Sequence, residues 1–287
     1  MDSKQQILAT GDTAQKTAEM IAHRAVEDLA LEAENSVAEM LRLVDRMHRA
    51  EPAREPSAGA APAPSAVDSR KLNWETCLDT FVILHPKCKK EYIEQFRQLR
   101  SRLTLVKKDW ANAGTELKIL SIASPSEKEG KSFVAANVAA ALALGSDRKV
   151  LLIDLNPTSA YATTSLGIQS APGLTEAIET NDWTPSVRSM ADTNLSVMPI
   201  GRLKAGNIDP VDFRRLPILL EKLRESFDWI ILDGPAFRES SDAELTASYA
   251  DANLLVVRKN HTAFEDVAQA LNAIPAERVL GIVFNHH

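Results

Sequence analysis

Apolar residues in the second half of the chain fall into short, nearly continuous runs that are bounded by turn residues. Helical patterns separate most of these runs, notably at 131–144, 210–226 and 261–273. Strands that are apolar on both faces and separated by helices are typical of a parallel sheet covered on both sides. The pattern therefore predicts an α/β domain with a mostly parallel sheet. The expected strands are 117–123, 149–155, 195–200, 229–232, 252–257 and 279–284.

The N-terminal part of the chain has a different, helical pattern. Residues 13–49 contain no Gly or Pro and are rich in Ala, Glu, Arg and Leu, which favours a helix. An apolar stripe with steps of three and four favours equally a helix folding back on the domain and a partner-docking or coiled-coil helix. Its members are Val26, Ala30, Ala33, Val37, Met40, Val44 and Met47.

A linker rich in Pro, Ala and Ser follows at 51–68. Such a segment buries too little apolar surface to offset the entropy of ordering, so we expect an extended tether. The sequence thus predicts a helical extension over 1–50, a flexible linker over 51–70 and a P-loop domain over 71–287.

Composition narrows the range of functions. The formal net charge of −6 gives no basic field for nucleic acid, so no nucleic-acid partner is expected. The two cysteines, Cys77 and Cys88, fit neither a zinc motif nor a disulfide framework. The N-terminus lacks the basic and apolar regions of a secretory signal. These features favour a cytoplasmic protein.

A phosphate-binding motif follows the first expected strand. The segment Glu129-Gly130-Lys131-Ser132 leads into the helical stretch 131–144, which is the order of strand, loop and helix in a P-loop. Helix N-terminal N–H groups and the helix dipole favour phosphate, while the lysine would reach the β/γ-phosphates and the serine would ligate Mg²⁺. Gly-Lys-Ser alone is common, and Pro125 stands at the first glycine of the strict motif. The expected ATP contacts are Ser126, Glu127, Lys128, Glu129, Gly130, Lys131, Ser132 and Phe133.

Two acids end later apolar runs, Asp154 in Ile-Asp-Leu-Asn and Asp233 in Leu-Asp-Gly-Pro. Ligands of open parallel sheets sit beyond the carboxyl ends of the strands, so both acids should face the P-loop crevice from strands that flank the P-loop strand. With Ser132 they would hold Mg²⁺. A single strand-end Asp is more often a turn or N-cap residue, but two favour the nucleotide site.

At this point the sequence, over roughly residues 80–286, resembles the bacterial tyrosine kinases (BY-kinases), which work with capsule and exopolysaccharide export machinery. They belong to the deviant P-loop ATPases that include partition and division-site ATPases. The blocks that carry the resemblance are 127–132, 153–158, 233–236 and Leu280-Gly281-Ile282-Val283-Phe284-Asn285. In related ATPases the final Asn helps to read adenine, so the resemblance implies this role for Asn285.

The resemblance also covers Glu94, Arg97 and Arg100, which match a Glu-x-x-Arg-x-x-Arg pattern that the family uses in ring assembly. Spacing of three places the residues near one helix face. The position before the P-loop strand favours homo-oligomerisation over a merely solvated face.

The sequence departs from the family at three places. Lys128 replaces a loop glycine, where a side chain would either crowd the phosphate or add a cation. Asn156 replaces the second acid of the Asp-x-Asp block and lacks its charge, although it remains a catalytic candidate with Lys131, Asp154 and Asp233. The family's tyrosine-rich tail has no counterpart, because the tyrosines are Tyr92, Tyr161 and Tyr249.

The resemblance implies an ATP-binding and Mg²⁺-binding regulator of exopolysaccharide or capsule biosynthesis and export. Its partner would be a membrane polysaccharide co-polymerase, through which it would lie at the inner membrane. If active, it would be an ATPase or a tyrosine-kinase-like phosphotransferase. Two alternatives stay open: a positioning or partition ATPase, whose extra lysine is Ser126 here, and a non-catalytic oligomeric scaffold.

Overall fold

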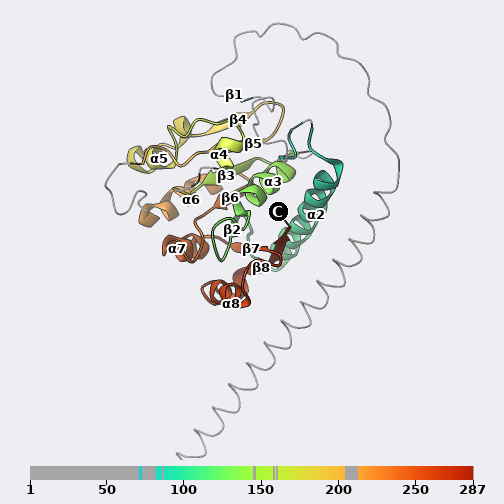
Figure 1. The fold of residues 1–287 in the computed structure, drawn as a ribbon. Helices are drawn as coiled ribbons and strands as arrows, with labels where there is room; N and C mark the ends of the chain where they lie inside the picture. The colour runs from blue at the N-terminus through green and yellow to red at the C-terminus, as the bar shows by residue number, and fades with distance from the viewer. Residues whose placement is uncertain are drawn as a thin grey trace, which may run out of the picture. The chain divides into compact units, whose positions relative to one another are not determined.

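The structure is a computed structural model that describes residues 71–72, 82–85, 87–144, 147–157, 159, 161–203 and 213–286. Its centre is an eight-stranded sheet (Figure 1). The strands are β1 Lys71–Leu72, β2 Ile119–Ala123, β3 Val150–Asp154, β4 Arg188–Met190, β5 Leu195–Met198, β6 Trp229–Asp233, β7 Ala252–Arg258 and β8 Val279–Asn285. The α-helices are α2 Lys90–Asn112, α3 Lys131–Ala143, α4 Tyr161–Ser165, α5 Leu174–Thr180, α6 Leu216–Arg224, α7 Asp242–Tyr249 and α8 Phe264–Asn272.

The strand order across the sheet is β1-β4-β5-β3-β6-β2-β7-β8. Neighbouring strands pair in parallel except β4 and β5, which are antiparallel. The predicted fold class, a mostly parallel sheet of the P-loop type, is therefore confirmed.

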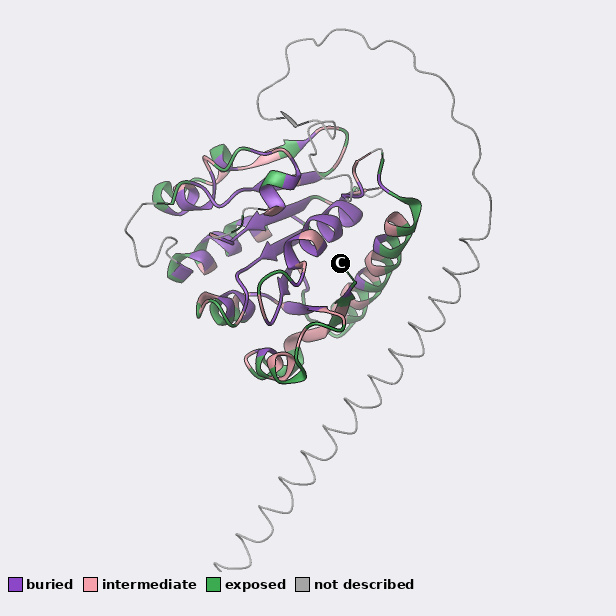
Figure 2. Cartoon of the chain, viewed as in Figure 1, coloured by how far each residue is buried: buried purple, intermediate pink, exposed green. Residues whose placement is uncertain are grey.

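Helices cover both faces of the sheet. In Figure 1, α2 and α3 lie along one face, and α5, α6, α7 and α8 lie along the other. Successive strand residues alternate between the two cores: on β6, Ile231 packs with the α3 side and Ile230 with the α6 side. The central strands are consequently buried throughout (Figure 2), which explains why their sequences are continuous apolar runs.

Helix α3, which follows the P-loop, is almost entirely buried. Every one of its residues except Phe133 is buried. Its alanines have small side chains and the highest helix propensity, so the helix can lie close to the sheet without a polar face. This packing fixes the direction of its N-terminus, where the phosphate motif lies.

The placement of the two acid-bearing strands corrects one expectation. The P-loop strand β2 has β6 and β7 as neighbours, whereas β3 pairs with β5 and β6. Asp233 therefore ends a flanking strand, but Asp154 ends a strand that is one place further away. The expectation that both strands flank β2 was wrong, because apolar runs predict that strands exist and carry no information on which strands pair.

Two helices begin later than the sequence pattern indicated. Over the described part of the 210–226 stretch, a 3-10 turn at Phe213–Arg215 precedes α6, which carries a proline in its first turn. Helix α8 begins at Phe264 instead of 261, because the preceding residues form a turn in which Asn260 has a positive φ of 58°.

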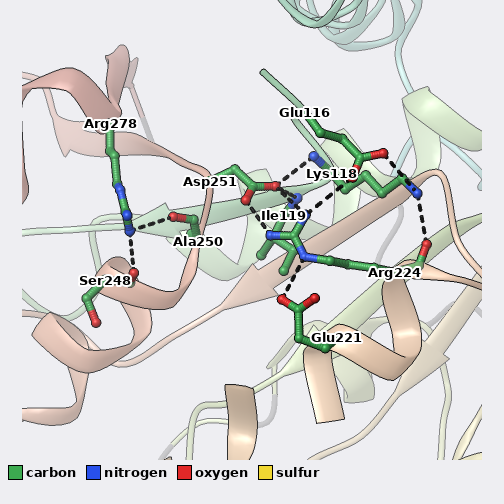
Figure 3. A network of polar contacts seen from close by, with 9 residues as sticks. All are labelled: Glu116, Lys118, Ile119, Glu221, Arg224, Ser248, Ala250, Asp251 and Arg278. Atoms are coloured by element: carbon green, nitrogen blue, oxygen red, sulfur yellow. Dashed lines mark hydrogen bonds and ion pairs between the residues drawn. The ribbon is translucent and has the colours of Figure 1, made fainter. Parts of the chain in front are cut away.

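A polar network joins the amino ends of several strands (Figure 3). The Oδ2 atom of Asp251 accepts hydrogen bonds from the backbone N–H groups of Lys118 and Ile119, at 2.8 and 2.7 Å. The Arg224 guanidinium pairs with the same carboxylate. These bonds fix the start of β2 against β7 and α6, and so help to set the position of the P-loop at the far end of β2.

The predicted N-terminal helical extension over 1–50 and linker over 51–70 lie outside the described residues. Among the helices that the structure does describe, none combines the length and apolar character needed to cross a bilayer.

Candidate functional site

The P-loop connects the carboxyl end of β2 to the N-terminus of α3. The loop is held from one side by the segment after β6, because the Phe237 and Arg238 N–H groups donate to the Ser124 and Pro125 carbonyl oxygens, both at 3.1 Å. The Ser124 hydroxyl also donates to the carbonyl oxygen of Ser126 at 2.8 Å. The loop thus leads into a helix N-terminus whose first-turn N–H groups suit an anion.

Gly130 occupies a position that strongly favours glycine. Its φ is 89°, and a Cβ at this residue would lie 2.0 Å from the Asn285 side-chain nitrogen. That nitrogen donates a hydrogen bond to the Glu129 carbonyl oxygen at 2.9 Å. The Asn285 side chain, at the end of β8, is therefore packed against the P-loop; its adenine-reading role stays a prediction.

Lys128, at the position where the resemblance leads us to expect a glycine, has a backbone conformation that favours glycine. Its φ is 63°, in the left-handed region, and its side chain is exposed. A side chain with a Cβ is disfavoured there by about 1–2 kcal/mol. The loop therefore keeps the glycine-type backbone path in spite of the substitution.

The two predicted acids meet at the carboxyl end of the sheet. Asp154 and Asp233 are partner residues in the parallel pairing of β3 with β6, and both are fully buried. Lys131, at the start of α3, is 6% exposed, and its charge acts on both carboxylates. The structure thus brings together Lys131, Asp154 and Asp233, with Ser132 beside Asp233.

Asp233 is a buried carboxylate without a hydrogen-bond partner among the described residues. Its pKa is raised from 3.8 to about 7, mainly by burial; the Lys131 charge acts to lower the pKa and the Asp154 charge to raise it. The Ser132 hydroxyl also acts to lower the pKa, but it makes no hydrogen bond of ordinary geometry with the carboxylate. A buried carboxylate left in this state is costly, and a cation would compensate it.

Asp154 is better satisfied than Asp233. Its Oδ2 accepts a hydrogen bond from the Thr163 hydroxyl at 2.6 Å, and its Oδ1 accepts one from the Asn156 N–H at 3.1 Å. Burial raises the pKa of Asp154, while these bonds and Lys131 lower it. Asn156 itself is buried beside this acid, and its side-chain oxygen accepts the Ser159 N–H at 3.3 Å.

The donor set fits Mg²⁺ rather than a metal bound wholly by protein. In the described ranges, no group of three or more His, Cys, Asp or Glu residues could hold a metal ion. Mg²⁺ is commonly held by one or two carboxylates together with waters and substrate phosphates. The partnerless Asp233 oxygens, with the Ser132 hydroxyl nearby, meet that description.

The remaining loop residues divide by the direction of their side chains. Ser126 is half-buried, and Glu127 and Lys128 are exposed at the tip of the loop. Phe133 instead packs edge-on against Phe96 of α2, with ring centroids 5.8 Å apart. Only its backbone can therefore serve a bound phosphate.

The three predicted assembly residues lie on α2, away from this crevice. Glu94 and Arg97 are exposed and form an ion pair with a nitrogen–oxygen distance of 3.8 Å. Arg100 instead donates to the carbonyl oxygens of Leu144 and Ala141, at 2.9 and 3.4 Å, at the C-terminus of α3. Arg100 thus has a role within the chain, and the assembly role of all three stays a prediction.

Two residues that support the site were not found from the sequence. Thr163 binds Asp154 from nine residues downstream, and Thr262 binds the Glu129 carboxylate from 133 residues away. Neither has a local signal: Thr163 stands next to Thr164, and Thr262 lies in a polar turn. Only the folded chain brings them to the site.

A pocket of about 630 Å³ lies at the opposite end of the sheet, lined by Trp110, Arg224, Tyr249, Asp251 and Arg278 among others. Its charged groups largely satisfy one another (Figure 3), as in the bidentate contact of Arg224 with Asp251. Ligands of open α/β sheets bind beyond the carboxyl ends of the strands, so the P-loop end is the better candidate for a ligand site than this pocket.

A family model described as cellulose biosynthesis protein BcsQ matches residues 117–283, more than half of the chain. The chain belongs to the BcsQ family. The match begins just before the P-loop strand and ends within β8, so it covers the P-loop, Asp154 and Asp233 but stops two residues before Asn285.

Relatives of this BcsQ-family chain include tyrosine kinases. A tyrosine-protein kinase, ptk of Acinetobacter johnsonii, is 28% identical over 67% of this chain and 26% of its own length. The succinoglycan biosynthesis transport protein ExoP of Rhizobium meliloti is 31% identical over 60% of this chain and 23% of its own length. The chain thus spans about a quarter of the length of these two relatives.

The kinase domain of the Escherichia coli tyrosine kinase ETK has a similar structure. Its TM-score is 0.59 at 26% identity, over 68% of this chain and 75% of that domain. The resemblance of this BcsQ-family chain to the bacterial tyrosine kinases, expected from its motifs, is therefore confirmed.

Proposed function

We propose that this chain binds ATP with Mg²⁺ at the P-loop end of the sheet. The observation that carries the proposal is the buried Asp233 carboxylate, which has no hydrogen-bond partner in the described structure and lies near Lys131 and Ser132. A site that leaves a carboxylate unsatisfied beside a helix N-terminus suits a cation together with a phosphate chain.

Each residue has a distinct part in this proposal. Lys131 and the N–H groups of the first turn of α3 would hold the phosphates, and Ser132 and Asp233 would hold Mg²⁺. The bound ion would neutralise phosphate charge. Asp154 is already held by Thr163 and Asn156, so it would act through the water around the ion. Asn156 supplies an amide where the kinases have an acid, which favours ATP binding over rapid phosphoryl transfer.

We further propose that the ATP-bound state regulates exopolysaccharide or capsule biosynthesis and export, with a membrane polysaccharide co-polymerase as partner. The support is that the matching family and a relative carry names from cellulose and succinoglycan biosynthesis. The exposed Glu94 and Arg97 side chains on α2 are accessible for homo-oligomer contacts.

The test of the ATP site is a nucleotide titration with and without Mg²⁺, on the full chain and on Asp233→Asn. We expect Mg²⁺ to strengthen ATP binding by the wild type at least tenfold and to have little effect on the variant. Equal Mg²⁺ dependence in both proteins would contradict the assignment of Asp233. In the same samples, ADP release and antibody detection of phosphotyrosine measure turnover.

A further inference from the structure

The Glu129 side chain ties the P-loop to the turn between β7 and α8. The residue is 3% exposed. Its Oε2 atom accepts a hydrogen bond from the Thr262 hydroxyl at 2.6 Å and another from the backbone N–H of Arg258. The carboxylate is therefore directed to the β7–α8 turn, which we define as residues 258–262.

The orientation of the Glu129 carboxylate toward the turn affects the electrostatics of a phosphate site. A free carboxylate one residue before the Gly-Lys pair would repel a phosphate, since like charges close together in a poorly hydrated site repel strongly. Hydrogen bonds to a carboxylate are stronger than hydrogen bonds between two neutral groups. The donors of the turn can therefore hold the Glu129 carboxylate in place. The negative charge is thereby kept with the turn donors.

The turn is itself bonded to the end of β8. The His261 and Thr262 N–H groups donate to the Arg258 carbonyl oxygen, both at 3.2 Å, and the Lys259 N–H donates to the Asn285 carbonyl oxygen at 2.8 Å. Asn285 in turn donates its side-chain N–H to the Glu129 carbonyl oxygen. Glu129 is consequently held by its side chain through the turn and by its main chain through β8.

We propose that Glu129 is a positioning residue that couples the P-loop to the β7–α8 turn, so that nucleotide affinity depends on the order of that turn. The inference rests on the proposed ATP site and adds a control point to it. Groups that change the turn, such as a molecule that contacts its exposed residues, then change the P-loop without touching the nucleotide.

The experiment compares Glu129→Gln, Thr262→Val and the double variant in the full chain. Glu176→Gln is the matched control, because Glu176 also accepts backbone N–H and threonine hydroxyl bonds, from Gly173, Arg202 and Thr175. Thr180→Val is the control for Thr262, since its hydroxyl makes a bond within the α5 region. Two quantities are measured: ATP affinity by calorimetry, and amide exchange of residues 126–132 in the nucleotide-free protein.

We expect each single variant to bind ATP about three- to tenfold more weakly, the range that one lost hydrogen bond gives. The ATP affinity of the double variant should be close to that of the single variant with the lower affinity, because both substitutions remove the same coupling. P-loop amides should exchange faster in these variants than in the wild type, and at the wild-type rate in both controls. If the Glu129 variant fails to fold, Thr262→Val alone tests the coupling, with the same two measurements.

Wild-type ATP affinity in Thr262→Val, with unchanged P-loop exchange, would overturn the coupling, as would fully additive losses in the double variant. If the wild type bound no ATP, the proposed function would fail. The exchange measurement would still decide whether Glu129 and Thr262 order the P-loop.

Discussion

The side-chain nitrogen of Asn285 lies only 2.0 Å from the position that a Cβ on Gly130 would occupy. The two residues are 155 positions apart in the sequence; Asn285 ends β8 and Gly130 directly precedes α3. Because Gly130 also has a φ of 89°, a Cβ at this position would both strain the backbone and displace the Asn285 amide from its bond to the Glu129 carbonyl oxygen.

Gly130→Ala should therefore destabilise the fold more than an ordinary glycine substitution. Gly114→Ala is the matched control, because Gly114 also has a positive φ, of 78°, but a Cβ there would meet nothing within 4 Å. We expect the control to lose about 1–2 kcal/mol for its backbone conformation, and Gly130→Ala to lose about 1–3 kcal/mol more for the overlap. Urea unfolding measures both; equal losses would show that Asn285 moves aside freely.

Substituting Lys128 with glycine should stabilise the fold, in contrast to Gly130→Ala. Replacing it with glycine should relieve the cost of its left-handed backbone, which is about 1–2 kcal/mol, less about 0.4–1 kcal/mol for the greater freedom of the unfolded chain. We expect Lys128→Gly to raise the free energy of unfolding by about 0.5–1 kcal/mol. Lys128→Ala keeps the backbone cost and should change little. A gain in the alanine variant as large as in the glycine variant would assign the effect to the side chain.

The pH dependence of stability should reveal the state of Asp233. Its pKa is raised to about 7 in the folded chain from an ordinary 3.8, so between these values the folded state binds more protons than the unfolded state. Stability from this group is thus present at low pH and lost as pH rises from about 4 to about 7. Asp233→Asn should remove this loss and unfold at higher urea than the wild type at pH 7.5, with no such gain at pH 4.

The exposed Asp109, on α2, is the control for this measurement. Asp109→Asn makes the same change of side chain on the exposed face of α2 and so controls for the loss of one carboxylate from the chain. If Asp233→Asn kept the wild-type dependence, the buried carboxylate would not carry the raised pKa.

Arg97 and Arg100 should respond differently to alanine. Arg100 bonds the carbonyl oxygens at the end of α3, so Arg100→Ala should lose about 1–2 kcal/mol of unfolding free energy. Arg97 makes an exposed pair with Glu94, so Arg97→Ala should lose less than about 0.5 kcal/mol. If the α2 face assembles, sedimentation should show Arg97→Ala shifting the oligomer toward monomer at unchanged stability. Equal stability losses would contradict the division of roles.

The elements around the site could be predicted from the sequence where one local signal suffices. Strands β3 and β6 are buried on both faces and so are apolar at every position up to the acid, and α3 begins at the lysine of Gly-Lys-Ser. The short strand β4 and helices α5 and α7 were not predicted, because their few apolar residues give no sustained period.

Contacts between residues far apart in the chain could not be predicted from the sequence. It located Asp154 and Asp233 but not the β6 strand's place between β3 and β2. It identified Glu129 as part of the loop but not its bond to Thr262, and Asn285 as a family position but not its contact with the P-loop. These contacts depend on how strands order themselves in the sheet, which residue patterns along the chain do not encode.

The most direct test of the ATP site is calorimetric titration of the full chain with Mg·ATP, for the wild type, Lys131→Ala and Lys149→Ala. Lys149 is exposed and directly precedes β3, at the end of the strands opposite to the P-loop. We predict saturable binding by the wild type and by Lys149→Ala, and affinity at least tenfold weaker for Lys131→Ala. Equal affinity of the wild type and Lys131→Ala, or no binding by the wild type at millimolar ATP, would contradict the account.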